Sequence, residues 1–310
     1  MSLGVVFPGQ GSQRVGMLSE AAERFPVVKA TFEEAGEAVG YDLWDLVSNG
    51  PEERLSLTEF TQPAILTASV ALYRAFASQH ELAPSAGAGH SLGEYSALVA
   101  AGALSLGDGA LLVSKRGAAM QQAVPVGEGA MAVVLGLDDA LVADICSQIS
   151  SADAFVGGVN FNAPGQVVIA GATAAVEIAV SSLKEAGARR AMPLPVSAPF
   201  HTPLMQPAAD VMAEAFETVT WHTPGFPVVS NVDGALQTSP DAIKASLVEQ
   251  ISSPVLWTEC VSTLRSIGCD HFIECGPGNV LCGLSKRIDK TLPIKSIESV
   301  MAIDAGLADL

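Results

Sequence analysis

The sequence predicts an α/β protein in which a large domain with a parallel sheet carries a smaller inserted domain. Two observations support this fold class. Apolar strand-like segments alternate with helical segments up to residue 101, and the order of the elements changes between residues 129 and 196. A chain of 310 residues is long enough for this arrangement, and its core needs no disulfides for stability.

The large domain begins with residues 3–7, an apolar run that is typical of a buried strand and ends in the glycine-rich turn 8–13. Residues 62–79 follow a turn and have helical periodicity. Residues 85–89 are small and precede an apolar run, 95–101, that suits a buried helix. This alternation of strands and helices predicts a parallel sheet covered by helices.

The inserted domain is predicted from a change in the order of elements. The expected elements are a strand at 129–137, a helix at 138–149, strands at 155–162 and 166–171 with a turn at 163–165, a helix at 174–188 and a strand at 189–196. This βαββαβ order is typical of a ferredoxin-like unit. We therefore expect a small domain at 127–197 inside a large domain made of 1–126 and 198–310. Its hinges would be 125–127 and 197–199, and a cleft between two domains is a usual place for a ligand.

The net charge of the chain restricts its partners. The charge is −17, from 16 Lys and Arg against 33 Asp and Glu. Nucleic acids and anionic membranes both attract a basic protein surface. We therefore expect neither nucleic acid nor a membrane as a partner.

The cysteines and the apolar segments indicate the compartment. The five cysteines are odd in number and form no C-x-x-C pair, so we interpret them as reduced thiols and expect neither disulfides nor a metal site. The apolar run near the start is too short for a signal peptide. No apolar stretch reaches the roughly 18–20 residues that span a bilayer without interruption. We therefore expect a soluble, cytoplasmic protein.

A candidate nucleophile lies in residues 89–93, Gly-His-Ser-Leu-Gly, which match the pattern G-x-S-x-G. In this pattern a strand turns sharply into a helix, which strains the serine backbone and exposes its hydroxyl, and the flanking glycines let neighbouring chains approach. The N–H of Leu92 would then lie at a helix N-terminus, where it can donate to an oxyanion. By itself the pattern fits an ordinary strand–helix turn equally well. With Ser91 as nucleophile, it indicates an α/β-hydrolase-like large domain.

A serine nucleophile needs a base, and near neutral pH this is usually a histidine. His201 is the best placed, because its proline-bounded loop follows the inserted domain and faces the predicted cleft. His90 adjoins Ser91, but neighbouring side chains in such a turn point apart. The alternative interpretation of His201 is a surface-loop residue. The remaining histidines fit surface or packing positions: His80, His222 and His271.

Arg116 is a candidate anion-binding residue. On a helix predicted at 108–124, it lies on the stripe of Leu112 and Met120, toward the apolar side. A guanidinium directed inward needs an anionic partner, because a buried unpaired charge is costly. That partner is either a structural carboxylate or a substrate carboxylate held by two hydrogen bonds.

The turn at 9–13 lacks the spacing and the lysine of a nucleotide-binding loop, so no nucleotide is expected there. A backbone N–H from such a loop is what a second oxyanion donor requires.

Several motifs together resemble the bacterial malonyl-CoA:acyl carrier protein transacylases and, more broadly, the acyltransferase domains of fatty acid and polyketide synthases. The resemblance extends over nearly the whole chain. It rests on residues 7–13 (FPGQGSQ), 89–95 (GHSLGEY), Arg116, 160–166 (NFNAPGQ), Phe200-His201, Gln250 with Pro254-Val255, and 274–278 (ECGPG). As an ordered set, these motifs are far more specific than any one of them.

The resemblance implies a role for each central residue. Ser91 would attack the thioester of malonyl-CoA and carry the malonyl group as an ester, while His201 takes and returns the proton. The backbone N–H groups of Gln10 and Leu92 would form the oxyanion hole. Arg116 would pair with the free malonyl carboxylate.

The remaining substrate-binding residues are also implied by the resemblance. In this family a main-chain carbonyl near Gln250 orients the histidine, which agrees with the lack of an obvious acidic partner. Phe200 would leave little room for an α-methyl group, and Met120 and Asn160 complete the expected site. Residues 198–199 depart from a typical member, which bears on fine substrate choice and not on the mechanism.

The implied partners are malonyl-CoA and an acyl carrier protein, and we expect the chain to act as a monomer. Exchange between thioester and ester is nearly balanced, so no cofactor is expected and the kinetics should be ping-pong. Acyl carrier proteins are acidic, so docking on this acidic chain would need a local basic patch. The candidate basic residues are Lys115, Arg189, Arg190, Lys286 and Arg287.

Two other functions fit parts of the sequence. A serine thioesterase or hydrolase shares the turn at the nucleophile, but it normally has an acidic residue between the serine and a histidine near the C-terminus. Plain hydrolysis also gives Arg116 no role. A non-catalytic carrier-protein binding module would not need Ser91, His201 and Arg116 together.

Overall fold

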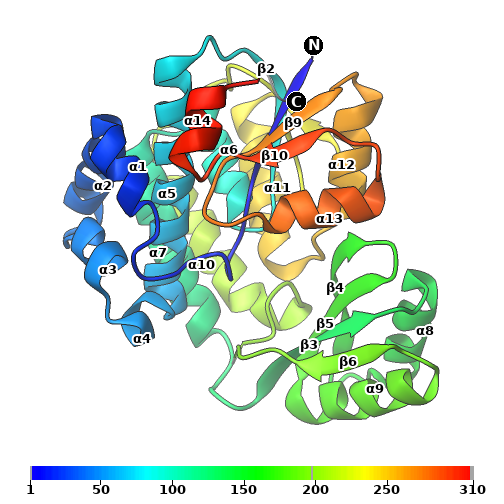
Figure 1. Ribbon diagram of the computed structural model, residues 1–310. Helices are drawn as coiled ribbons and strands as arrows, with labels where there is room; N and C mark the ends of the chain where they lie inside the picture. The colour runs from blue at the N-terminus through cyan, green and yellow to red at the C-terminus, as the bar shows by residue number, and fades with distance from the viewer. Residues whose placement is uncertain (1, 197, 308–310) are drawn as a thin grey trace.

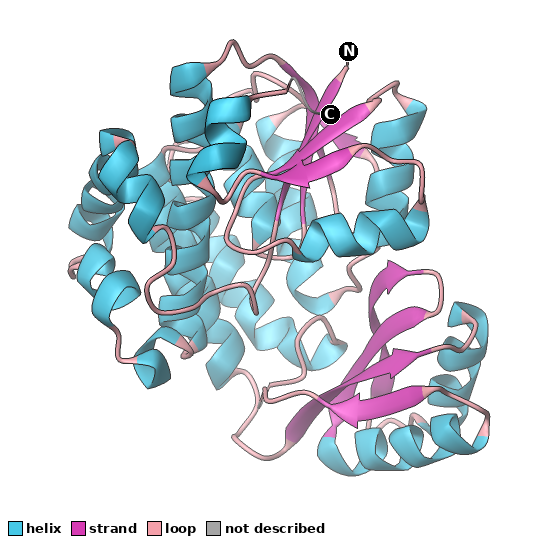
Figure 2. Ribbon diagram, in the orientation of Figure 1, coloured by secondary structure: helices cyan, strands magenta, loops and turns pink. Residues whose placement is uncertain are grey.

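The computed structural model describes residues 2–196 and 198–307 and contains two sheets in these residues (Figure 1). Ser197, which the sequence places in the second hinge, lies outside the described residues, as do residue 1 and residues 308–310. Figure 2 shows the larger sheet enclosed by helices, and the smaller sheet beside it with its own helices. The mixed α/β class expected from the sequence is confirmed.

Within the described residues, the larger sheet has the strand order β10-β9-β1-β2-β7-β8. Its strands are β1 (Leu3–Phe7), β2 (Pro84–Gly89), β7 (Val228–Val229), β8 (Leu236–Gln237), β9 (His271–Glu274) and β10 (Ile294–Ser296). In the parallel register Phe7 pairs with Gly89, so β1 and β2 end side by side. The two loops that follow these strands therefore meet at one edge of the sheet, where ligands of open α/β sheets usually bind.

The sheet is parallel, as expected from the sequence, except at one edge. The short strand β8 pairs antiparallel with β7. The chain reverses between them through Gly234, which has a φ of 67°. A direct hairpin of this kind can only return antiparallel, whereas parallel neighbours need a long crossover.

Helices cover both faces of the larger sheet. They are α1 (Ser19–Arg24), α2 (Pro26–Val39), α3 (Leu43–Asn49), α4 (Glu52–Leu55), α5 (Thr58–Gln79), α6 (Gly93–Ala100), α7 (Leu106–Gln122), the 3₁₀ helix η1 (Pro203–Met205), α10 (Gln206–Phe216), α11 (Pro240–Ser252), α12 (Trp257–Ser266), α13 (Val280–Ile288) and α14 (Val300–Ala305). Successive residues of β1 point to opposite faces: Val5 and Phe7 pack in one apolar cluster with α5 and α7, and Val6 packs in another with α12. A strand buried on both faces explains the unbroken apolar run at 3–7.

The helices between residues 19 and 55 are not predicted from the sequence. Three of those within the described residues, α1, α3 and α4, span only six, seven and four residues. Such short helices contain too few turns to produce a recognisable apolar period. Helix α7 begins two residues earlier than expected because Ser105 caps it, its Oγ accepting from the N–H of Asp108 at 3.0 Å.

The smaller sheet contains the elements expected from the sequence, in the order β4-β5-β3-β6 within the described residues. They are β3 (Gly129–Leu135), α8 (Asp139–Ile149), β4 (Val156–Ala163), β5 (Gln166–Ala172), α9 (Thr173–Glu185) and β6 (Arg190–Pro193). The paired strands are antiparallel, and α8 and α9 share an apolar cluster with the strands.

Backbone hydrogen bonds join the smaller sheet to the large part of the molecule. The N–H of Phe161 on β4 donates to the carbonyl of Val255 at 2.9 Å, and the N–H of Val255 donates to Val159 at 2.8 Å. Val255 lies between α11 and α12. The segment that follows α11 is therefore fixed to the edge of the smaller sheet.

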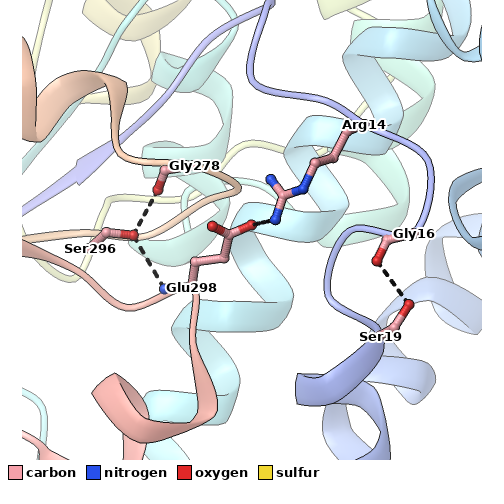
Figure 3. Close-up of polar contacts among 6 residues, drawn as sticks. All are labelled: Arg14, Gly16, Ser19, Gly278, Ser296 and Glu298. Carbon is pink, nitrogen blue, oxygen red and sulfur yellow. Dashed lines mark hydrogen bonds and ion pairs between the residues drawn. The ribbon is translucent and has the colours of Figure 1, made fainter.

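The loop that follows β1 is tied to the C-terminal part of the chain (Figure 3). The guanidinium of Arg14 forms an ion pair with Glu298. The N–H of Glu298 donates to Ser296 Oγ at 3.3 Å, and Ser296 Oγ donates to the carbonyl of Gly278 at 2.7 Å. Ser19 Oγ also closes the start of α1 by donating to Gly16 O at 2.8 Å. These contacts support a glycine-rich loop that has little secondary structure of its own.

None of the helices in the described residues is long and apolar enough to cross a bilayer.

Candidate active site

The turn that carries Ser91 has the tight geometry that its two glycines suggest. A Cβ on Gly89 would lie 1.8 Å from the carbonyl carbon of Gly93, and a Cβ on Gly93 would lie 2.1 Å from the carbonyl oxygen of Phe7. No other residue type fits at either position, because real Cβ atoms do not approach other atoms so closely. The backbone φ of Ser91 is 53°, in the left-handed region. The strained turn directs the Ser91 hydroxyl away from the sheet.

His201 lies against Ser91, although the two residues are 110 positions apart. Ser91 Oγ is 2.7 Å from His201 Nε2. His201 Nδ1 is 2.8 Å from the backbone carbonyl of Gln250 on α11, so it carries the proton that this carbonyl accepts. Nε2 is therefore the unprotonated nitrogen and faces the hydroxyl. Hydroxyl, imidazole and carbonyl form the chain that a serine nucleophile requires, with a carbonyl in place of a carboxylate.

The environment keeps the His201 imidazole neutral. Burial, and after it the positive charge of Arg116, together lower its pKa to about 3. The hydrogen bond to the Gln250 carbonyl opposes this shift, because it favours the protonated ring. His201 is also in the left-handed region, with a φ of 62°. In the described residues only Leu18, Ser91 and His201 are non-glycine residues with positive φ, and backbone strain of this kind gathers at functional sites.

Arg116 reaches the same point from α7. Its Nη2 donates to Ser91 Oγ at 3.1 Å and to the side-chain oxygen of Gln250 at 2.9 Å, and its Nη1 donates to Gln62 at 2.9 Å. The guanidinium also lies over the ring of Tyr95, 5.5 Å from its centre. The side chain is 1% exposed, which agrees with its predicted place on the apolar side of the helix.

The charge of Arg116 has no direct counter-ion in the described residues. No carboxylate oxygen there lies within 4.0 Å of its nitrogens, and its Nε has no hydrogen-bond partner in this part of the chain. Burial lowers the pKa of the guanidinium, and the neighbouring Tyr95 and Glu94 oppose this effect. A buried cation without an ion pair is costly, so the site favours an anionic ligand.

A cavity of about 130 Å³ contains Ser91, His201 and Arg116 in its wall. Five further residues that the sequence assigns to the site line the same cavity: Gln10, Leu92, Met120, Asn160 and Phe200. The N–H of Leu92 lies at the start of α6, where no intrahelical acceptor exists. The side-chain oxygen of Asn160 is buried and has no partner within the described residues. Gln250 does not line this wall; its backbone carbonyl binds His201 Nδ1, as the resemblance implies, and its side-chain oxygen accepts from Arg116.

A larger groove of about 780 Å³ adjoins the cavity. Gln10, Leu194, Val196 and Phe200 line both. The groove continues past Leu57 on one side. The arrangement offers room for a long substrate arm outside a small reaction chamber.

Several residues around the cavity were not found from the sequence. Gln62 lines the wall and binds Arg116, and Met131 lines the wall from β3. The sequence places Gln62 only at the start of a helix, and because the buried part of α5 also contains Thr61, Thr67 and Ser69, a polar residue there gives no distinct signal. His90 turns away from the nucleophile, as expected, and its Nε2 lies 2.7 Å from Asn162 Oδ1 on β4.

The comparison with known families defines the class of protein. The acyl transferase domain family matches residues 5–304, and the chain belongs to this family.

Individual relatives within the family carry more specific names. The malonyl CoA-acyl carrier protein transacylase of Escherichia coli (strain K12) is 52% identical over 302 residues, which cover 97% of each chain. The solved structure of the malonyl CoA-acyl carrier protein transacylase from Coxiella burnetii has a TM-score of 0.98 and 44% identity, and the match covers 100% of this chain and 98% of that one. A malonyl-transacylase solved in complex with a type II PKS acyl-carrier protein has a TM-score of 0.97 and 48% identity, with 100% of both chains covered.

Proposed function

We propose that this protein transfers the malonyl group of malonyl-CoA to the phosphopantetheine thiol of an acyl carrier protein, by way of a malonyl ester on Ser91. One observation carries the proposal: a buried guanidinium that has no counter-ion among the described residues lies 3.1 Å from the hydroxyl that is paired with a neutral imidazole. Malonyl-CoA combines a thioester with a free carboxylate, and these two groups match the hydroxyl and the guanidinium. The names of the relatives agree with this substrate and acceptor.

In the first half of the reaction, Ser91 Oγ attacks the thioester carbonyl as His201 Nε2 takes its proton. The carbonyl oxygen becomes an oxyanion, which accepts hydrogen bonds from the N–H groups of Gln10 and Leu92. When the carbon–sulfur bond breaks, His201 returns the proton to the sulfur and CoA leaves as a thiol. The malonyl group stays on Ser91 as an oxygen ester, with its carboxylate at Arg116.

In the second half, the thiol of the acyl carrier protein gives its proton to His201 and attacks the ester carbonyl. The same two N–H groups stabilise the second oxyanion, and Ser91 leaves with the proton from His201. Because CoA departs before the carrier protein reacts, the kinetics are ping-pong. Each step moves one proton and exchanges one acyl bond, so the scheme uses no cofactor.

Arg116 links substrate charge to the strength of the base. Its positive charge lowers the pKa of His201 in the free enzyme. A malonyl carboxylate at the guanidinium offsets that charge, and the pKa of His201 then rises toward its ordinary value. The imidazole becomes a stronger base when an anionic substrate is present. Acetyl-CoA brings no carboxylate and leaves both the cation and the base without this help.

Phe200 and Met120 limit the size of the acyl group. Both line the cavity of about 130 Å³ that contains Ser91. An α-methyl group on malonate would add volume on the side of Phe200, whose ring leaves little room for it. The buried oxygen of Asn160 supplies an acceptor toward the substrate.

The carrier protein docks on a basic patch that we define as Arg189, Arg190, Lys286 and Arg287. All four are exposed. Arg287 on α13 donates to the side chain of Gln166 at the start of β5, and Gly136, beside Arg189, donates to the carbonyl of Gly165 at 2.8 Å. The turn between β4 and β5 therefore brings the two pairs together. Lys115 is exposed on α7, beside α10, and is not part of this patch.

We also propose a finer description of the two parts of the chain. The large part, residues 1–126 and 198–310, is α/β-hydrolase-like, and the small part, 127–197, is ferredoxin-like. The serine turn after a parallel strand supports the first description, and the antiparallel order β4-β5-β3-β6 supports the second. The protein acts as a cytoplasmic monomer.

Intact mass after mixing with malonyl-CoA tests the function. The wild type is expected to gain one malonyl group, which a holo acyl carrier protein then removes, and Ser91→Ala is expected to gain none. Absence of the adduct in the folded wild type would favour a binding module. Release of free malonate faster than transfer would favour a hydrolase.

A further inference from the structure

Three buried polar side chains lie behind the nucleophile and outside the substrate cavity. Glu94 is in the first turn of α6, Asn231 follows β7, and Gln250 is on α11. None of the three is among the described residues that line the cavity, and Glu94 is only 2% exposed. The carbonyl of Gln250 binds the His201 ring, but the reaction scheme gives Glu94 and Asn231 no role. Buried polar groups of this kind need an explanation.

The side chain of Gln250 connects the guanidinium to Glu94. Its oxygen accepts from Arg116 Nη2 at 2.9 Å, while its Nε2 donates to Glu94 Oε2 at 2.8 Å and to the carbonyl of Ser91 at 3.0 Å. An amide has one accepting end and one donating end. If it were reversed, its NH₂ group would face the guanidinium and its oxygen would face the carboxylate. Glu94 therefore fixes the orientation in which Gln250 holds Arg116.

Asn231 holds the strained turn of the nucleophile. Its Oδ1 accepts from the N–H of Ser91 at 2.6 Å, and its Nδ2 donates to the carbonyl of Gly89 at 2.7 Å. These bonds satisfy the two peptide groups that flank His90, where the left-handed Ser91 breaks the regular backbone pattern. The backbone N–H of Asn231 donates to Glu94 Oε2 at 3.0 Å. The same carboxylate oxygen thus anchors Asn231 and Gln250.

We propose that Glu94 is a positioning residue for acyl transfer: through Gln250 and Asn231 it orients the guanidinium and the turn of the nucleophile. The inference rests on the proposed function and names a residue that never touches the substrate. Gln250 adds a second effect, because its backbone carbonyl binds His201 Nδ1. A shift of α11 at Gln250 therefore moves the contacts of the base as well as those of Arg116.

The role requires an acceptor oxygen and not a charge. Burial raises the pKa of Glu94 to about 7, against the hydrogen bonds from Gln250 and Asn231 and the charge of Arg116. Both hydrogen bonds end on Oε2, so the single amide oxygen of a glutamine can accept both. Glu94→Gln is therefore the conservative variant. Glu94→Ala removes the acceptor, and Glu94→Asp keeps the charge but withdraws it by one methylene.

The matched control is Val99→Ala, also on α6. Val99 is buried and packs beside Gly109 of α7, on the side of the helix that faces away from the polar network. The substitution Val99→Ala is expected to lower stability through lost packing alone. Each variant is characterised by melting temperature, by the kcat/KM of malonyl-ester formation on Ser91, and by the preference for malonyl-CoA over acetyl-CoA.

Glu94→Ala and Glu94→Asp are expected to lower kcat/KM for malonyl-CoA by about 10- to 100-fold, because small displacements of reacting groups cost this much. They should also lower the malonyl preference, since Arg116 loses its fixed partner. Glu94→Gln is expected to restore most of both quantities. Val99→Ala should lower the melting temperature and leave the rate and the preference unchanged.

Three outcomes overturn the proposal. In the first, Glu94→Ala keeps the wild-type rate and preference, or Glu94→Asp does so if the alanine variant does not fold. In the second, Glu94→Gln is as impaired as Glu94→Ala, and in the third, Val99→Ala loses the malonyl preference to the same extent. The failure of the proposed function is a different result, because the wild type itself would then form no malonyl ester.

Discussion

Removal of the Arg116 guanidinium is expected to abolish the preference for a substrate that carries a carboxylate. In this structure three of its five N–H bonds donate to Gln62, Gln250 and Ser91, which leaves two for a ligand. A hydrogen bond to a charged group contributes about 1.5–3 kcal/mol, so two of them amount to at least about 3 kcal/mol. At about 1.4 kcal/mol for each factor of ten, Arg116→Ala should lower kcat/KM for malonyl-CoA by at least about 100-fold.

Acetyl-CoA makes neither of these hydrogen bonds, so its kcat/KM should fall far less or rise. The assay is competition: equal malonyl-CoA and acetyl-CoA are mixed with the protein, and the two esters on Ser91 are quantified by intact mass. Arg74→Ala is the matched control, because it removes the same charge from a surface ion pair with Glu34. A malonyl-to-acetyl ratio in Arg116→Ala equal to that of the wild type, with an unchanged fold, would refute the role of the guanidinium.

Three further predictions concern the turn, the base and the docking patch. Gly93→Ala should destabilise the protein by about 1–3 kcal/mol or more and prevent ester formation, because its Cβ would overlap a carbonyl of β1. The control Gly107→Ala should do neither, because a Cβ there makes only an ordinary van der Waals contact; thermal melting checks the stability of both variants. Since the pKa of His201 is lowered to about 3, its imidazole is neutral well below pH 6.5, and kcat/KM for ester formation should stay level from about pH 5 to 8. Arg189→Glu combined with Arg287→Glu should raise KM for the carrier protein, most strongly at low salt, and leave ester formation from malonyl-CoA unchanged.

Each of these three has a result that would contradict it. Wild-type melting and acylation in Gly93→Ala would show that the close approach in the turn is not needed. A limb near pH 6.5 in the rate of ester formation would mean that the imidazole is exposed to solvent in the free enzyme. A Lys29→Glu control on α2 should leave the carrier KM unchanged, and an equal effect there would reduce the docking patch to a general charge effect.

The predictable parts of the site depend on local sequence. Gly89 and Gly93 predict a tight turn, because steric crowding at these positions leaves no alternative to glycine. The apolar stripe on the helix of Arg116 predicts that its side chain points inward. The smaller sheet was predictable for a similar reason: its strands and helices are long enough to show their period. Ser91 and His201 are connected by the order of the domains, because the loop of His201 follows the inserted domain, and by the resemblance to a family.

The remaining parts depend on contacts between distant segments. Gln62 and Asn231 act through partners 54 and 140 residues away, and nothing in their neighbouring sequence indicates this. Glu94 lies in a recognised motif, yet its role depends on Gln250 of α11, 156 residues away, which donates to its carboxylate. The short helices before residue 56 and the edge strand β8 are determined by packing and by one turn, so their own residues carry too weak a signal.

The backbone rung between β4 and Val255 ties the smaller sheet to the segment that supports the base. Val255 lies five residues beyond Gln250, whose carbonyl binds the imidazole. The joint between the two sheets and the support of the proton-transfer pair are therefore one continuous piece of chain.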